Sequence, residues 1–186
     1  MRRTFDLVDI DFLTQYGNSI LNNKDFRIEI QQLDKSDSRE FGSAAESVFH
    51  KHFHSRPVPG LPPGNYITLT PIKDMSNYNT KFDRELGDFL LDNVSIGFAA
   101  TIDVKFSTYP DLFPTITRDS IETFTGIYVL FNGDLTSVAF VPAEYFRELE
   151  KQKLIKFSSS GELRGKDYTH LIENRLEIVK VNRDYF

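Results

Sequence analysis

Two charged residues, Asp103 and Lys105, lie in the longest stretch with the pattern of a buried strand, residues 97–106. Side chains alternate across a strand with period two, so Asp103 and Lys105 share one face while Ile102 and Val104 share the other. The apolar face is predicted to be core. A carboxylate and an ammonium held on a rigid strand suggest metal-dependent chemistry, because buried charges are costly unless they are paired or bind metal.

A second carboxylate, Glu46, lies on a predicted helix. Residues 40–53 carry apolar side chains at helical spacing, and Glu46 lies beside that stripe. Gly42, one turn earlier, is expected to let the helix approach a neighbouring backbone, at a propensity cost of about 1 kcal/mol relative to Ala. Glu46 would then reach the edge of the sheet. The alternative is a surface Glu at a helix boundary, since Glu is rarely buried.

A third carboxylate, Asp88, opens a predicted strand directly after Gly87. Only a short turn separates this strand from residues 97–106, so the two are predicted to be neighbours in a hairpin. Three other acidic residues could take the place of Asp88, and one of them, Asp92, shares its strand face. These competitors are Asp83, Glu85 and Asp92.

The order of these residues resembles the PD-(D/E)xK nuclease superfamily, which includes restriction endonucleases and Holliday junction resolvases. The resemblance covers about residues 40–142: a helix with Glu46, a strand opened by Asp88, a strand with Asp103-x-Lys105, then a helix and a strand. Asp103-Val104-Lys105 is the one match to the [D/E]-x-K motif in this chain. The chain departs from the family at Gly87, where the family has a proline before its first Asp.

The resemblance implies a metal-dependent DNA endonuclease that hydrolyses phosphodiester bonds, as restriction and recombination nucleases do. Asp88 and Asp103, with the carbonyl of Val104 as a further ligand, would bind Mg²⁺ or Mn²⁺, which prefer oxygen ligands, and Glu46 would bind a second ion or orient a metal-bound water. Lys105 would position the attacking water and stabilise charge on the phosphate. RNA is the alternative substrate. The alternative to a catalytic site is an Asp103–Lys105 ion pair on a non-catalytic adaptor or nucleic-acid-binding protein built on the same scaffold.

The chain as a whole is predicted to be a single α/β domain, with a central mixed β-sheet flanked by helices on both faces and a restriction endonuclease-like core. Residues 7–21 predict a helix and residues 26–30 a half-exposed strand, which together form an N-terminal extension over residues 1–39. The pattern further predicts a helix over 117–124, strands over 126–131 and 137–141, a helix from Pro142 to about Lys153, a short strand over 154–157, a helix over 167–174 and a strand over 176–181.

The formal net charge of −5 is unevenly distributed. Residues 1–146 hold 13 Lys/Arg and 20 Asp/Glu, a net of −7, whereas residues 147–186 hold 9 and 7, a net of +2. An acidic body beside a basic C-terminal region suits a protein that binds cations and approaches a polyanion. The residues predicted to contact nucleic acid are Lys151, Lys153, Lys156, Arg164 and Lys166, and the alternative path uses Lys73, Lys81 and Arg84.

Composition narrows the remaining possibilities. The chain has no Cys, which excludes disulfides and thiolate zinc sites. No apolar run reaches the length of a membrane span and the N-terminus lacks the apolar segment of a signal peptide, so we expect a cytoplasmic protein without a membrane partner. A nuclease this small is expected to act as a homodimer to cut both strands.

The histidines of residues 50–54 could suggest a zinc site. On a helix, however, only His50 and His54 share a face, and the sequence offers no third ligand nearby. A solvated helix end is therefore the favoured interpretation.

Overall fold

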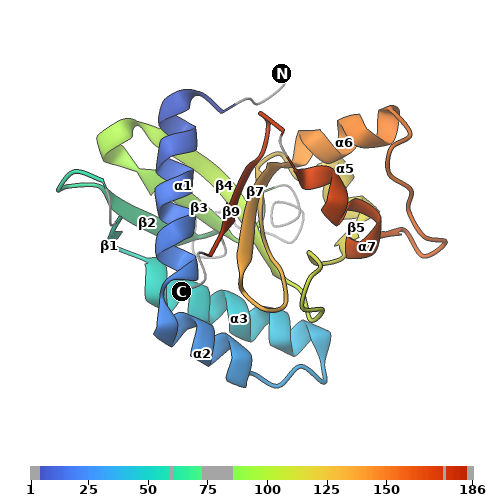
Figure 1. Ribbon diagram of the computed structural model, residues 1–186, viewed down its shortest axis with the longest axis horizontal. Helices are drawn as coiled ribbons and strands as arrows, with labels where there is room; N and C mark the ends of the chain where they lie inside the picture. Colours follow the sequence, from blue (N-terminus) through green and yellow to red (C-terminus); the bar gives the residue numbers. More distant parts are fainter. Residues whose placement is uncertain (1–4, 59–60, 73–85, 174, 184–186) are drawn as a thin grey trace.

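A seven-stranded mixed sheet lies at the centre of the computed structural model, which describes residues 5–58, 61–72, 86–173 and 175–183 (Figure 1). Its strand order is β1-β2-β3-β4-β6-β7-β9. The parallel pair is β4–β6, and the other neighbours run antiparallel. The strands are β1 (Arg56–Pro57), β2 (Tyr66–Pro71), β3 (Phe89–Asn93), β4 (Phe98–Phe106), β6 (Ile127–Phe131), β7 (Ser137–Pro142) and β9 (Val179–Asn182).

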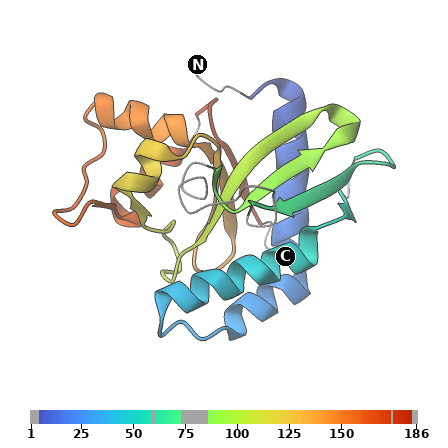
Figure 2. The same cartoon turned by 180° about the vertical axis from the view of Figure 1, so that it is seen from behind.

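Helices cover both faces of this sheet (Figure 2). One face packs against α1 (Leu7–Leu21), α2 (Lys24–Gln32) and α3 (Ser38–Phe53), and the other against α5 (Arg118–Thr123), α6 (Ala143–Lys151) and α7 (Gly165–Tyr168). Strand β6 contributes to both cores and is buried along its whole length. The prediction of a single α/β domain with a mixed sheet between helices is confirmed.

Smaller elements complete the second helical layer. Strands β5 (Ile116–Thr117) and β8 (Glu162–Leu163) form a separate antiparallel pair, which fixes the segment before α7 beside the start of α5. Two 3₁₀ turns, η2 (Val94–Ile96) and η3 (Thr169–Ile172), follow β3 and α7. The β5–β8 pair thereby holds the basic residues that follow β8 at a defined place.

The predicted strand over residues 26–30 is wrong, because this segment is helix α2. Asn23 caps the helix by accepting a hydrogen bond from the Phe26 N–H at 2.9 Å. Phe26 and Ile30, one turn apart, are buried, whereas Ile28 between them is 38% exposed. The N-terminal region is therefore two helices that share the main core, not a helix and a strand.

Two predictions near the C-terminus also need correction. Residues 154–157 form no strand, and the short strand of this region is β8, which finds its partner in β5. The predicted helix over 167–174 begins earlier, as α7, and tightens into η3 at Thr169. Across the residues described, no helix has the length and apolar character needed to cross a lipid bilayer.

His50 of α3 and His54 at its C-cap bind the backbone of β2, whereas His52 binds the side chain of Glu29 at 2.9 Å. The Nε2 atom of His50 lies 2.9 Å from the carbonyl oxygen of Leu69, and the Leu69 N–H donates to Nδ1 of His54 at 3.0 Å. Strand β1 pairs β2 only at Tyr66 and Ile67, so these rings replace a neighbouring strand beyond that point. The prediction that the histidines lie on a solvated helix end is wrong. His50 and His54 instead bind backbone groups of β2 that would otherwise lack partners.

Replacing His54 with alanine is expected to lower the free energy of unfolding by about 1–3 kcal/mol, because the Leu69 N–H loses its acceptor in a partly buried place. Urea unfolding at neutral pH measures the change. Lys51→Ala serves as the control on the same helix, since Lys51 makes an exposed ion pair with Glu29 and its loss should leave stability unchanged. Equal losses for both variants would contradict this role.

Candidate functional site

Asp103 and Lys105 form an ion pair on β4. Lys105 Nζ lies 3.2 Å from Asp103 Oδ2, and the two side chains are 14% (Asp103) and 29% (Lys105) exposed. Ile102 and Val104 are buried on the other face of the strand, in the core with α3. The predicted division of β4 into an apolar and a charged face is confirmed.

Asp88 lies directly before β3, where the backbone pairing between β3 and β4 ends. Phe89 faces Ile102 in the β3–β4 register, and the Asp88 N–H donates to the Ile102 carbonyl at 2.8 Å. Beyond this point the side chain of Asp88, not its backbone, bonds to β4. The Asp88 carboxylate turns to the strand edge, where Oδ2 accepts the Val104 N–H at 2.8 Å.

Gly87 allows this turn. Its φ of +74° lies in the left-handed region, and a Cβ there would stand 2.6 Å from the Ile102 carbonyl oxygen. Proline fixes φ near −65° and could not take this conformation. The proline that the resemblance predicts before the first Asp would not fit here, because the backbone at this position requires glycine.

Glu46 reaches the same place from the other side of the sheet. Helix α3 packs on the apolar face of β4, whereas Asp103 and Lys105 extend from the opposite face. Because β3 begins only at Phe89, the edge of β4 beside Val104 is not covered by β3, and Glu46, Val104 and Lys105 line one cleft there. An extended residue points its N–H and C=O to the same side, so the Val104 carbonyl also faces the Asp88 side.

The predicted role of Gly42 is wrong in one respect. A Cβ at Gly42 would meet no atom within 4 Å, so the glycine does not bring α3 against another backbone. Gly42 instead lines the cleft beside Glu46. A side chain at this position would narrow the cleft.

The charges of Glu46, Asp88, Asp103 and Lys105 influence one another. Burial, then the charges of Asp103 and Glu46, raise the pKa of Asp88 well above its ordinary value. Burial alone would lower the pKa of Lys105, but the carboxylates, led by Asp103 and followed by Asp88 and Glu46, raise it overall. With every group ionised, three carboxylates and one ammonium give a net charge of −2. This local excess of negative charge needs a proton or a cation.

The competing acids fare differently from Asp88. Asp92 pairs with Ala99, four residues along β4 from Asp103, which is about 13 Å at the rise of a strand. Asp83 and Glu85 lie outside the described residues. Within the described ranges, no three His, Asp or Glu side chains gather closely enough to hold a metal ion together. The carboxylates nonetheless supply the hard oxygen donors that Mg²⁺ and Mn²⁺ prefer.

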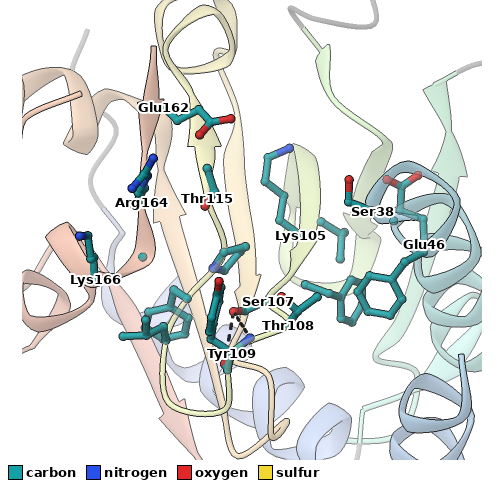
Figure 3. A pocket seen from close by; sticks show the side chains of 18 residues that line it. Ser38, Glu46, Lys105, Ser107, Thr108, Tyr109, Thr115, Glu162, Arg164 and Lys166 are labelled. Carbon is teal, nitrogen blue, oxygen red and sulfur yellow. Dashed lines mark hydrogen bonds between the residues drawn. The ribbon is translucent and has the colours of Figure 1, made fainter. Parts of the chain in front are cut away.

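Glu46 and Lys105 line a cleft of about 860 Å³, whereas Asp88 and Asp103 are not among the described residues that line it (Figure 3). One wall is the N-terminal half of α3, the floor is the end of β4 with residues 107–115, and the opposite wall is residues 162–166. In Figure 3, Lys105 stands between Glu46 on one side and Arg164 and Lys166 on the other. The cleft thus has Glu46 on one wall, whereas the other, which we call the basic wall, carries Arg164 and Lys166 beside Glu162.

The structure brings together three of the five basic residues predicted to contact nucleic acid. Arg164 and Lys166 line both the cleft and an adjoining cavity, where they join Lys156. Lys151 ends α6 and Lys153 follows it, and neither is among the described residues that line the cleft. The alternative path over Lys73, Lys81 and Arg84 lies outside the described residues.

Several cleft residues were missed by sequence reasoning. Ser107, Tyr109 and Thr115 belong to a loop that the sequence shows only as bracketed by Pro110 and Pro114. Their side chains enter the cleft because the loop follows directly on β4. The position of the loop, immediately after Lys105, suggested that it could line a site. Its residue types alone, however, do not distinguish a loop that lines a cleft from one that only connects two elements.

Comparisons with protein-family models, with curated proteins and with solved structures find no match to this chain. Function is therefore inferred from the geometry and charges of the cleft.

Proposed function

We propose that this chain is a Mg²⁺- or Mn²⁺-dependent nuclease that hydrolyses phosphodiester bonds, with a core of the PD-(D/E)xK type. One observation carries the proposal: Asp88, directly before β3, lies against Asp103, while Glu46 and Lys105 face the same cleft. The order α3, β3, β4, α5, β6 also follows the order of elements that the resemblance implies.

The metal would be held by Asp88 and Asp103, with the Val104 carbonyl as a further oxygen donor, and Glu46 would act through a water molecule because the three carboxylates do not gather closely enough to share one ion. These two aspartates repel each other, which fits a place where a divalent cation restores neutrality. A bound ion would neutralise phosphate charge and make a water molecule more acidic. Glu46, on the far side of the cleft from the basic wall, would orient that water.

Lys105 would act on the reacting phosphate. Its ammonium is fixed on β4, and its raised pKa keeps it charged at neutral pH. A cation already in place stabilises negative charge that develops in the transition state without reorganisation. Arg164 and Lys166, on the opposite wall, would hold phosphates of the bound strand.

The deciding experiment is cleavage of a supercoiled plasmid and of a single-stranded DNA circle with Mg²⁺, Mn²⁺ or EDTA. We expect metal-dependent breakage that EDTA stops. Nicked product indicates single-strand cuts, and linear product indicates paired cuts of the kind a homodimer makes. Intact substrates with both metals would overturn the proposal.

A non-catalytic nucleic-acid-binding protein is the second candidate. The observation in its favour is the 3.2 Å Asp103–Lys105 ion pair, which gives Lys105 a structural partner. In that case the parent would bind DNA and cut neither substrate.

Salt dependence tests the basic wall. We expect the triple variant Lys156→Gln, Arg164→Gln, Lys166→Gln to bind DNA with a shallower log–log salt slope, by about 0.9 per lost phosphate contact on a duplex. Fluorescence anisotropy in EDTA, over a series of KCl concentrations, measures this slope. The double variant Lys151→Gln, Lys153→Gln is the matched control and should keep the parent slope. A triple variant with the parent slope would place the nucleic acid elsewhere.

A further inference from the structure

Tyr109 is a large aromatic residue that the cleft leaves open to solvent. Its side chain is 67% exposed, and it lines the cleft on the loop that follows β4 (Figure 3). The cleft's other rings are packed into the protein: Phe41 and Phe113 are buried, and Phe106 stacks on Phe131 at 4.7 Å between centroids. Among the described lining residues, Tyr109 therefore offers the ring face that a ligand could reach.

The backbone of Tyr109 is held in place although its ring is exposed. The Tyr109 N–H donates to Ser107 Oγ at 3.0 Å, and the Tyr109 carbonyl accepts the N–H groups of Gly133 at 2.9 Å and Leu112 at 3.3 Å. A Cβ at Gly133 would stand 2.4 Å from that carbonyl oxygen, so the close approach depends on glycine. An exposed ring on a fixed backbone loses little entropy when a ligand packs against it.

The surroundings of Tyr109 suit a nucleic-acid strand. The cleft is lined by three cations, Lys105, Arg164 and Lys166, and by two carboxylates, Glu46 and Glu162, so its lining carries a net charge of +1 when every group is ionised. Proteins that bind single strands combine such a charged groove with aromatic rings on which bases stack. In an intact duplex both faces of each base are already stacked on neighbours, so the ring of Tyr109 has no free base face to meet.

We propose that Tyr109 stacks on an unpaired base, so that the substrate of this cleft is a nucleic-acid strand that is single-stranded at the bound nucleotide. This inference rests on the proposed nuclease function for the identity of the ligand. Tyr109 is a specificity residue here: it selects the strand, while the carboxylates and Lys105 act on the phosphate.

The test is binding without cleavage. Labelled oligothymidine and a labelled duplex of the same length are titrated in EDTA with the parent, Tyr109→Ala and Tyr109→Phe. Stacking contributes about 1–3 kcal/mol per base, so Tyr109→Ala should weaken oligothymidine binding about 5- to 150-fold. Tyr109→Phe keeps the ring and should bind like the parent. Tyr66→Ala is the control for loss of a surface ring, because Tyr66 is also exposed but lies on β2.

Each outcome is decisive. A parent that binds oligothymidine more tightly than the duplex, with the loss confined to Tyr109→Ala on oligothymidine, supports stacking. An unchanged Tyr109→Ala, an equal loss on both ligands, or a parent that prefers the duplex overturns it. Cleavage is scored separately: stacking with no metal-dependent cleavage refutes the nuclease and retains the strand preference, and cleavage with no stacking effect does the reverse.

Discussion

Replacing Lys105 with alanine is expected to slow cleavage at saturating substrate about 100- to 1,000-fold, the effect of removing one preorganised group that stabilises transition-state charge. Binding of metal and of DNA should change little, because the proposed work of Lys105 belongs to the transition state. Single-turnover cleavage of the plasmid, with DNA affinity measured in EDTA, separates the two effects.

Asp103→Ala is the comparison for this variant. It should also stop cleavage, but through the loss of a metal ligand, and DNA binding in EDTA should stay the same or become tighter because a negative charge near the phosphate is gone. If Asp103 and Lys105 only stabilise the fold as an ion pair, both folded variants will cut at the parent rate. That result would remove both residues from the catalytic site.

Replacing Asp88 with asparagine is expected to stabilise the metal-free protein at neutral pH. Burial and two neighbouring carboxylates raise the pKa of Asp88 in the folded state, so folding favours its protonated form. The stability that Asp88 contributes is therefore fully present below its unfolded pKa of about 3.9 and is lost as the pH rises through the raised folded value. Asparagine keeps an acceptor for the Val104 N–H. Because it stays uncharged, its contribution to stability is not lost as the pH rises.

The same variant should lose its response to Mg²⁺. An ion that binds only the folded parent stabilises it by about 2.7 kcal/mol at a concentration 100 times its Kd. Thermal unfolding of parent and Asp88→Asn from pH 4 to 8, with and without Mg²⁺, measures both effects. Asp92→Asn is the control, because Asp92 lies on the same strand but faces Ala99. A destabilised Asp88→Asn that still gains the parent's stabilisation from Mg²⁺ would contradict both expectations.

Alternation of side chains predicted the buried face of β4, which has 9 residues and so shows its period clearly. The strands over 127–131 and 137–142 were predicted instead from an apolar run and the turn that follows it, because both of their faces are buried. The prediction for residues 26–30 was wrong because apolar residues at positions 26, 28 and 30 fit the two-residue period of a strand, while positions 26 and 30 also fit one turn of a helix. Only packing decides there: Phe26 and Ile30 enter the core as a helical pair.

Asp88, Asp103 and Lys105 were predictable because they lie close in sequence, whereas Glu46, 57 positions before Asp103, was predicted from the helical apolar stripe beside it. Asp103-x-Lys105 is read from one strand, and Asp88 from the neighbouring strand of the same hairpin. The position of Tyr109 was not predictable, since its backbone carbonyl is held by the N–H of Gly133, which lies 24 positions further along the chain. Contacts of this range leave no periodic signal in the sequence.

The left-handed backbone at Gly87 also affects how sites of the proposed nuclease type can be found in other genomes. A search pattern that demands proline before the aspartate encodes one backbone path into the strand, with φ near −65°. At +74°, the φ of Gly87, the backbone enters the strand by a different path, and glycine is the residue that this path selects. Patterns that accept glycine at this position, followed by a hairpin and an acid-x-lysine strand, would therefore retrieve chains that the literal proline motif discards.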